Sequence, residues 1–316
     1  MHSLIRDTQD ASAPFRILSL DGGGAKGFYT LGLLMEIEAM LGAPLHSKFD
    51  LIFGTSTGSI IAALLALGFN VEQIVKLYKN HVPLVMSNKN AASRSAALRK
   101  LATEVFGNST FEDFETGIGI VSTNWMTEMP MIFKNRTSQA YGRKATFVPG
   151  FGVSVADAVT ASCSAYPFFE RTVVRTSNGE LIDLIDGGYC ANNPALYAIA
   201  DAVKALQKKN QDIRLVSLGV GSYPEPKKNI FMSLVWKYIV SVQLLQKTLD
   251  TNTRSMDKLR TILFSDIPTI RISDSYSDPS LATDLLESDV IKLNQLLQLG
   301  RESFAKREQD LRNLLA

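Results

Sequence analysis

One serine of this chain lies where an apolar strand is expected to turn sharply into a helix. Ser56 stands between Gly54 and Gly58, after the apolar run 49–53 and before an apolar helix expected over residues 58–68. A Gly-x-Ser-x-Gly turn in this setting presents a hydroxyl above the end of a sheet, where it can act as a nucleophile. The same pattern also occurs in ordinary strand-to-helix connections, so it needs support from other catalytic groups.

A cluster of glycines follows an earlier expected strand, over residues 15–20. The chain reads Asp-Gly-Gly-Gly-Ala-Lys-Gly over residues 21–27, and a helix is expected after it. Backbone N–H groups at the start of a helix can stabilise the negative oxygen that forms when a nucleophile attacks an ester. Gly22, Gly23 and Gly24 are therefore candidates for an oxyanion hole, and a tight turn is the alternative.

The same segment also fits a different class of protein. Gly22-x-Gly24-x-x-Gly27 matches the dinucleotide-binding pattern, which expects an acidic residue about 20 positions later at the end of a second strand. That stretch is helical or loop-like here, and Asp50 opens a strand instead of closing one. An oxidoreductase therefore stays only as an alternative. Lys26 is unusual in the first turn of a helix, where the dipole disfavours a cation; a substrate phosphate, a carboxylate or solvent are its candidate partners.

The chain has few histidines to activate a serine. A nucleophile-elbow hydrolase uses a histidine that follows the serine and the acid in the sequence. The three histidines, His2, His46 and His81, all precede any downstream acid. The sequence therefore predicts that a carboxylate activates Ser56 directly.

A suitable carboxylate ends an expected strand over residues 181–185. Asp186 is followed by Gly187 and Gly188, so its carboxyl group can project at the edge of the sheet. An acid in a partly dehydrated cleft has a raised proton affinity and can act as a general base. A plain turn is the alternative for Asp-Gly-Gly. Asp183 is a second candidate, but it lies inside the strand and lacks the glycines.

Together these motifs resemble the patatin-like phospholipases. Residues 21–27, 54–58, 186–188 and Asn192-Asn-Pro194 occur in the order of that family, with weaker matches at 161–169 and 215–221. The resemblance implies a Ser56–Asp186 dyad, an oxyanion hole at Gly22, Gly23 and Gly24, and neither metal nor cofactor. The supporting motif positions are Lys26, Gly27, Gly54, Gly58, Gly187 and Gly188. The resemblance also implies a three-layer α/β fold, with a mostly parallel central sheet covered by helices on both faces.

Composition agrees with one enzyme domain. The 316 residues are 46% hydrophobic, which suits a single large core. We expect a polar leader over residues 1–14 and one domain over 15–316, ending in helices from about Leu281. The leader lacks the apolar run of a signal peptide, so we expect a cytoplasmic protein with two free cysteines. A net charge of +2 gives no reason to expect a nucleic-acid polymer as partner.

The expected substrate is a membrane phospholipid, cleaved at the inner membrane surface. Two apolar segments are candidates for lipid contact: residues 84–86, expected in a loop, and a long helix over 230–245. That helix could be a lid, a membrane contact or an interface in a homo-oligomer. A thioesterase or a general lipase shares the same machinery and stays as an alternative.

The resemblance also suggests a regulator. Compact bacterial members of the family include antiphage effectors that cyclic nucleotides switch on, and this chain is similar to them in size. A cyclic di- or trinucleotide would need cationic partners. Two basic segments supply the candidates, which are Arg94, Arg99, Arg136 and Arg143.

Overall fold

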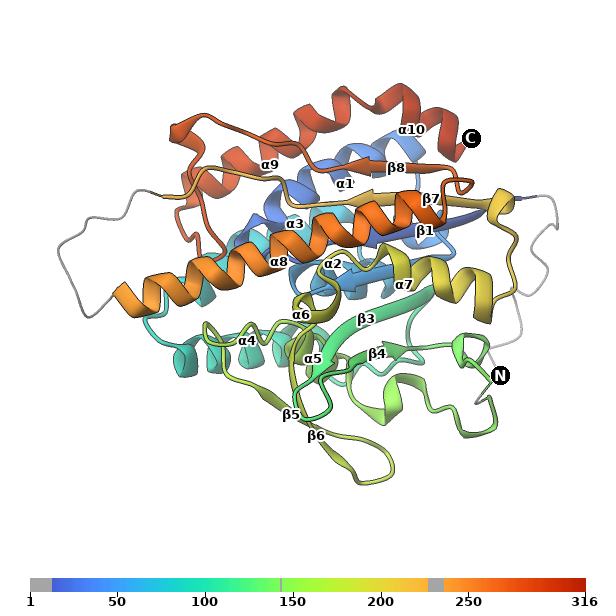
Figure 1. Ribbon diagram of the computed structural model, residues 1–316, viewed down its shortest axis with the longest axis horizontal. Helices are drawn as coiled ribbons and strands as arrows, with labels where there is room; N and C mark the ends of the chain where they lie inside the picture. The colour runs from blue at the N-terminus through green and yellow to red at the C-terminus, as the bar shows by residue number, and fades with distance from the viewer. Residues whose placement is uncertain (1–12, 143, 227–235) are drawn as a thin grey trace.

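The computed structural model describes residues 13–142, 144–226 and 236–316, with side chains over 13–142, 144–226 and 244–316. Figure 1 shows strands at the centre and helices around them. The described residues do not include 1–12, Arg143 or 230–235. These were predicted as part of a polar leader, a partner for a nucleotide and the start of a long helix.

An eight-stranded sheet forms the middle layer, in the order β5-β6-β3-β2-β1-β7-β8, with β4 pairing β3. Five strands are parallel: β1 (Phe15–Leu20), β2 (Leu51–Thr55), β3 (Gly117–Asn124), β7 (Ile213–Leu218) and β8 (Thr269–Ile272). The other three are antiparallel to their neighbours: β4 (Pro130–Lys134), β5 (Thr172–Arg175) and β6 (Leu181–Asp186). The predicted mostly parallel sheet is confirmed.

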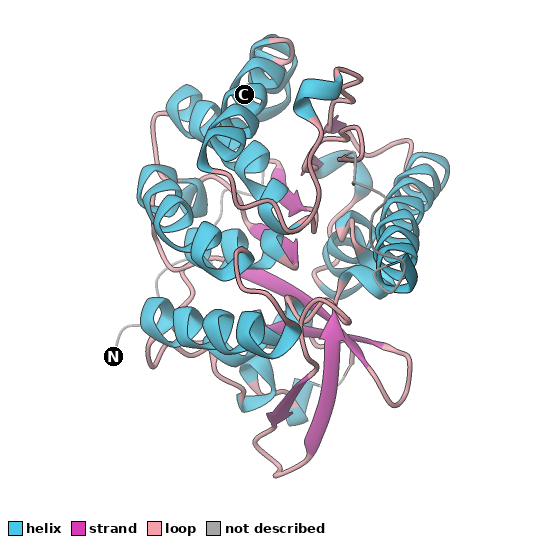
Figure 2. Ribbon diagram, turned by 90° about the vertical axis from the view of Figure 1, so that its left-hand side faces the viewer, coloured by secondary structure: helices cyan, strands magenta, loops and turns pink. Residues whose placement is uncertain are grey.

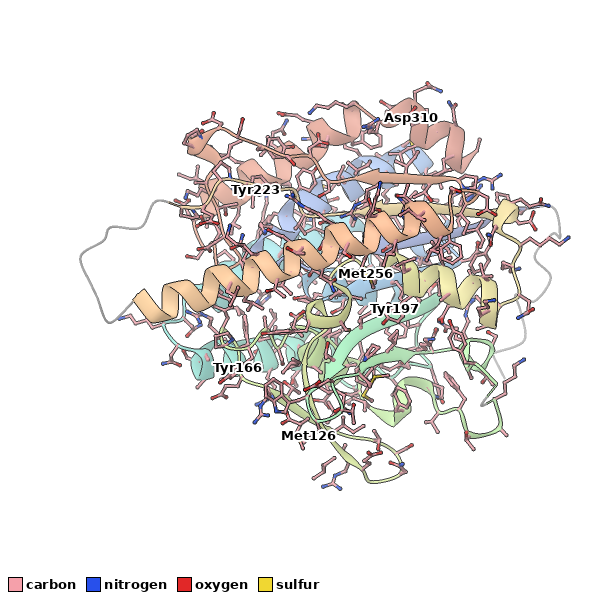
Figure 3. The ribbon with its side chains drawn as sticks, in the orientation of Figure 1. Met126, Tyr166, Tyr197, Tyr223, Met256 and Asp310 are labelled. Atoms are coloured by element: carbon pink, nitrogen blue, oxygen red, sulfur yellow. The ribbon has the colours of Figure 1, made fainter. Side chains whose placement is uncertain are left out.

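Helices cover both faces of this sheet, as the alternation of side chains along its strands requires. Leu18 belongs to a core cluster that includes side chains of α1 to α5 and α9. Its neighbour Ile17 points to the other face and belongs to a second cluster, with side chains of α6 and α7. Tyr197 of α7 and Met256 of α8 border this second cluster (Figure 3). The helices are α1 (Gly27–Leu41), α2 (Thr57–Ala66), α3 (Val71–Met86), α4 (Ala91–Phe106), α5 (Val155–Ser162), α6 (Gly188–Ala191), α7 (Ala195–Ala200), α8 (Trp236–Leu263), α9 (Val290–Ala305) and α10 (Glu308–Leu315). Figure 2 shows α8 on the opposite side of the strands from most of the other helices.

Two predicted segments differ from the structure. Residues 84–86 form the last turn of α3 and not a loop, because the apolar face of that helix continues past Pro83 and buries Val85. The helix predicted over 230–245 is described only from Trp236, and it continues to Leu263. Within the described residues, no helix combines the length and the apolar character needed to cross a bilayer.

Candidate functional site

Ser56 occupies a strained turn between β2 and α2. Its φ is 51° and its ψ is −126°, a backbone conformation that costs a residue with a side chain about 1–3 kcal/mol. The glycines on either side allow the close packing that this turn needs. A Cβ on Gly54 would lie 2.3 Å from the Gly58 carbonyl oxygen, and a Cβ on Gly58 would lie 2.3 Å from the Leu20 carbonyl oxygen. The geometry is that of a nucleophile elbow.

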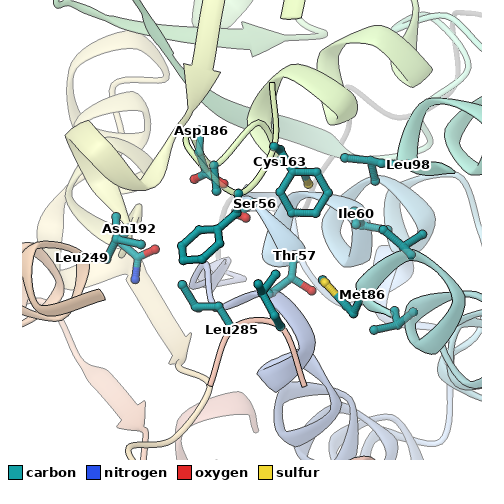
Figure 4. Close-up of a pocket in the computed structure, with 18 of the residues that line it drawn as sticks. Ser56, Thr57, Ile60, Met86, Leu98, Cys163, Asp186, Asn192, Leu249 and Leu285 are labelled. Carbon is teal, nitrogen blue, oxygen red and sulfur yellow. The ribbon is translucent and has the colours of Figure 1, made fainter. Parts of the chain in front are cut away.

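Asp186 meets this turn from the end of β6, although it lies 130 positions further along the chain. Figure 4 shows the Ser56 and Asp186 side chains together in one cavity. Asp186 is 2% exposed, and burial raises the pKa of its carboxyl group to about 6. Two hydrogen bonds act in the opposite direction, from the Ser56 hydroxyl and from the Gly188 N–H at 2.7 Å. A carboxylate with this pKa can accept a proton from a serine at neutral pH.

A short segment at the C-terminal end of α5 fixes both residues. The Ser162 hydroxyl accepts a hydrogen bond from the Ser56 N–H at 2.9 Å and donates to the Val121 carbonyl at 2.6 Å. Two residues later, the Ser164 carbonyl accepts from the Asp186 N–H at 3.0 Å. Residues 161–169 match a motif of the resemblance, but no local pattern predicts the role of Ser162, since its partners are set by folding of distant segments.

The glycine loop 22–24 lies on the other side of Ser56. Gly23 and Gly24 line the cavity, and neither N–H donates a hydrogen bond to any described residue. The Gly22 N–H donates instead to the Asn192 carbonyl at 3.0 Å. This geometry narrows the candidate oxyanion hole to Gly23 and Gly24, and gives Gly22 the role of holding the loop.

Asn192 ties the glycine loop to α8. Its side-chain amide donates to the Gly22 carbonyl at 3.3 Å and to the Thr253 hydroxyl at 2.7 Å. Its backbone N–H donates to the Asn252 side chain at 3.0 Å. The position of α8 is therefore coupled to the position of the loop.

Asp21 and Arg271 form a buried ion pair at the base of the glycine loop. The Arg271 guanidinium donates to both carboxylate oxygens of Asp21, and also to the Ser217 hydroxyl at 2.9 Å. Asp21 is 2% exposed. The sequence analysis missed Arg271, because β8 is short and its pairing with β7 brings together residues 250 positions apart.

Removal of Arg271 should therefore destabilise the protein. Arg271→Met leaves the Asp21 carboxylate buried without its partner, so we expect the free energy of unfolding to fall by about 3 kcal/mol or more. Denaturant unfolding measures this change. The matched control, Arg175→Met on an exposed part of β5, should change it by less than about 0.5 kcal/mol. Equal effects of the two substitutions would contradict the structural role of the pair.

Lys26 and Asp183, two other predicted residues, also have clear positions. Lys26 is 4% exposed, and burial lowers the pKa of its ammonium group; Asp250 and Asp284 act against this shift, but no described residue forms an ion pair with it. Its contact with a substrate phosphate stays a prediction. Asp183 pairs with Arg171 at 2.9 Å and does not line the cavity, which favours Asp186 as the base.

The cavity around Ser56 is apolar. It has a volume of about 70 Å³, and its walls come mainly from α2, α3, α4 and the segment 163–169. A second apolar cavity of about 40 Å³ continues from it between the same helices, and Ile60, Val82, Leu98 and Leu101 line both. No described histidine lines the cavity of Ser56; His81 borders the second one and His46 lies at another site. The two cysteines are free thiols, as predicted, and Cys163 lines the first cavity.

The four candidate arginines are not grouped. Arg94 is buried and donates to the Phe168 carbonyl at 3.1 Å, where it supports the cavity wall. Arg99 is exposed on α4. Arg136 lines a separate polar cavity, and Arg143 is outside the described residues.

The fold and the site define a hydrolase of the nucleophile-elbow class, in which a glycine loop and a buried carboxylate face the serine. The family model for patatin-like phospholipases matches residues 18–199. The chain belongs to this family, and it is an ester hydrolase. The family match spans the glycine loop, which packs against Ser56 and Asn192, so the alternative of a dinucleotide-binding oxidoreductase is wrong.

Individual relatives agree with this assignment. A cUMP-AMP-activated phospholipase of Escherichia coli is 65% identical over 300 residues, which cover 95% of this chain and 93% of that protein. A cGAMP-activated phospholipase of Pseudomonas aeruginosa is 27% identical over 66% of this chain and 62% of its own length. Among solved structures, human GIVD cytosolic phospholipase A2 matches with a TM-score of 0.51 at 12% identity, over 99% of this chain and 62% of that one. This last likeness supports the fold alone.

Proposed function

We propose that this phospholipase cleaves fatty acyl esters of membrane phospholipids through a Ser56–Asp186 dyad, and that a cyclic nucleotide activates it in defence against phage. The observation that carries the dyad is that Ser56, on a strained turn, and the buried Asp186 carboxylate line the same apolar cavity, where the serine hydroxyl acts to lower the pKa of the acid. Activation is supported by the relatives from Escherichia coli and Pseudomonas aeruginosa, which are a cUMP-AMP-activated and a cGAMP-activated phospholipase. The site of action is the cytoplasmic surface of the inner membrane.

The reaction proceeds in two halves. The Ser56 oxygen attacks the ester carbonyl while its proton passes to Asp186, and the N–H groups of Gly23 and Gly24 stabilise the oxyanion. Collapse of this intermediate breaks the ester bond, and Asp186 returns the proton to the departing lysophospholipid oxygen. A water molecule then gives a proton to Asp186 and attacks the acyl-enzyme, which releases the fatty acid and restores Ser56.

The proposal is tested with phospholipid vesicles and mass spectrometry of the released lipids. Wild-type protein is incubated with and without cyclic UMP-AMP or cGAMP. We expect release of fatty acid and lysophospholipid, at a rate that one of the nucleotides raises. Equal rates of hydrolysis with and without nucleotide would contradict the proposed activation. An absence of fatty acid release in every mixture would contradict the proposed phospholipase activity. Thioester and triglyceride substrates in parallel test the thioesterase and general lipase alternatives.

The rate should depend on the ionisation of Asp186. A general base works only when it is ionised, so kcat/KM should rise about tenfold per pH unit up to about pH 6 and then level off. A short-chain soluble ester is the suitable substrate, because its binding does not depend on vesicle charge. A profile that stays flat from pH 7 down to pH 4.5 would contradict the raised pKa of Asp186.

The second apolar cavity should set the accepted length of the acyl chain. Ala102→Leu adds side-chain volume to a wall residue of that cavity, so we expect kcat/KM for a palmitoyl ester to fall about tenfold or more. Hydrolysis of a butyryl ester should stay within about twofold. Ala96→Leu, on the exposed side of the same helix, is the control and should change neither substrate. If Ala102→Leu lowered kcat/KM equally for both esters, the acyl chain would not occupy the second cavity.

A further inference from the structure

A polar cavity of about 280 Å³ lies at the opposite end of the sheet from Ser56. We call it the amino-end cavity, because it is lined at the first residues of the parallel strands: Phe15 opens β1, Asp50 precedes β2 and Thr116 precedes β3. In Figure 1 the arrows of β7 and β8 point to the left, so this end of the sheet lies to the right. Its volume is near the lower end of the range for small-molecule sites, which is about 300 Å³.

Two cations line the amino-end cavity beside an aromatic ring. They are the Arg136 guanidinium and the Lys208 ammonium. The Lys208 nitrogen lies 5.1 Å from the centroid of the Phe15 ring. Guanidinium and ammonium groups are the usual partners of phosphate oxygens, Arg through paired hydrogen bonds and Lys as a point charge.

The remaining polar groups of the amino-end cavity suit the sugar and base of a nucleotide. The His46 Nε2 lies 3.1 Å from a Glu115 carboxylate oxygen, so the imidazole holds this carboxylate at the wall of the cavity. The carboxylates of Asp50 and Glu115 can accept from ribose hydroxyls or base amino groups.

The two elements that hold Ser56 both reach the amino-end cavity. Strand β2 begins directly after Asp50 and runs to the residue before Ser56. Helix α2 runs back from Ser56 to Ala66, whose carbonyl accepts a hydrogen bond from the Glu115 N–H at 2.8 Å. A ligand in the cavity that binds one arrangement of these residues more tightly therefore shifts the elbow toward that arrangement.

We propose that the amino-end cavity binds the activating nucleotide, with Arg136 and Lys208 on phosphate and Asp50 and Glu115 on the sugar or base. The proposal rests on the proposed function, in that it assigns a place to the regulator of that same reaction. The other candidate arginines are less suitable as phosphate partners, since the Arg94 side chain supports the wall of the catalytic cavity and the exposed Arg99 does not line the amino-end cavity.

Isothermal titration of full-length protein with cyclic UMP-AMP, and separately with cGAMP, tests the site. We expect the dissociation constant of the bound nucleotide to rise at least tenfold in Arg136→Ala and in Lys208→Ala. Lys208 is only partly buried, so its substitution keeps the test valid even if Arg136→Ala folds poorly. The matched control is Lys209→Ala, an exposed neighbour that does not line the cavity, and its affinity and hydrolytic rate should match wild type.

These measurements can contradict the assignment of the cavity and the proposed function separately. Wild-type affinity in both Arg136→Ala and Lys208→Ala would overturn the assignment of the cavity, and so would an absence of binding by the wild-type protein. Ser56→Ala should bind the nucleotide as tightly as wild type, because titration needs no turnover. If the nucleotide bound through Arg136 and Lys208 but no lipid were hydrolysed, the proposed function would fail while the site stood.

Discussion

Ser56→Ala is expected to lower phospholipid hydrolysis by roughly 10⁵-fold, because without the serine hydroxyl no acyl-enzyme can form. Alanine carries the same Cβ as serine, so it adopts the φ of 51° at a similar cost and the protein should remain folded. Fatty acid released from vesicles in the presence of the activating nucleotide measures the loss. Ser87→Ala, an exposed serine after α3, is the control and should keep full activity.

If Ser56→Ala released fatty acid at the wild-type rate, another nucleophile would carry the reaction. An unfolded variant is recognised by its circular dichroism spectrum, and Ser56→Gly then serves in its place, since glycine also lacks the hydroxyl and accepts the φ of 51° without strain.

Asp186→Asn is expected to lower kcat by about 10³-fold while it stabilises the fold at pH 8. The amide cannot take the serine proton, which accounts for the loss of rate. The gain in stability follows from the pKa of Asp186, which rises from its usual value near 4 to about 6 on folding. Above pH 6 the wild-type protein must hold a buried carboxylate ionised, at a cost of about 3 kcal/mol that the amide avoids.

The two effects are measured on the same variant. Denaturant unfolding should give a higher free energy of unfolding for Asp186→Asn than for wild type at pH 8, and the difference should shrink as the pH falls below about 6. Asp183→Asn, on the same strand but outside the cavity, should keep kcat within about threefold. A larger loss in Asp183→Asn than in Asp186→Asn would reverse the assignment of the base.

The raised pKa and the substrate preference have one physical origin. An apolar cavity that accepts an acyl chain also removes water from Asp186, and this desolvation raises its proton affinity. A carboxylate at its ordinary pKa would be a weak base toward a serine hydroxyl. The acyl cavity therefore contributes to activation of Ser56 as well as to binding.

Local pattern sufficed to predict the strands that carry the site. The expected strand over 15–20 coincides with β1, and Asp186 ends β6 as the following glycines indicated. The short strands β4, β5 and β8 were not predicted, since four or five residues give little periodicity. The loop predicted over residues 84–86 is instead the end of α3, because burial of Val85 extends that helix past Pro83.

The support of the site could not be predicted in the same way. Ser162 bonds to the Ser56 N–H across 106 positions, and Arg271 reaches Asp21 across 250. Contacts of this kind depend on strand order and register, which no local pattern specifies. The Gly22 N–H was a reasonable oxyanion donor until the fold brought the Asn192 carbonyl to it.

The dyad is tested most directly by labelling with a fluorophosphonate, which forms a covalent bond with an activated serine. We predict one adduct per chain, which peptide mass spectrometry locates at Ser56, and labelling that is at least a hundredfold slower in Asp186→Asn. An adduct at another residue, or labelling of Asp186→Asn at the wild-type rate, would contradict the central claim.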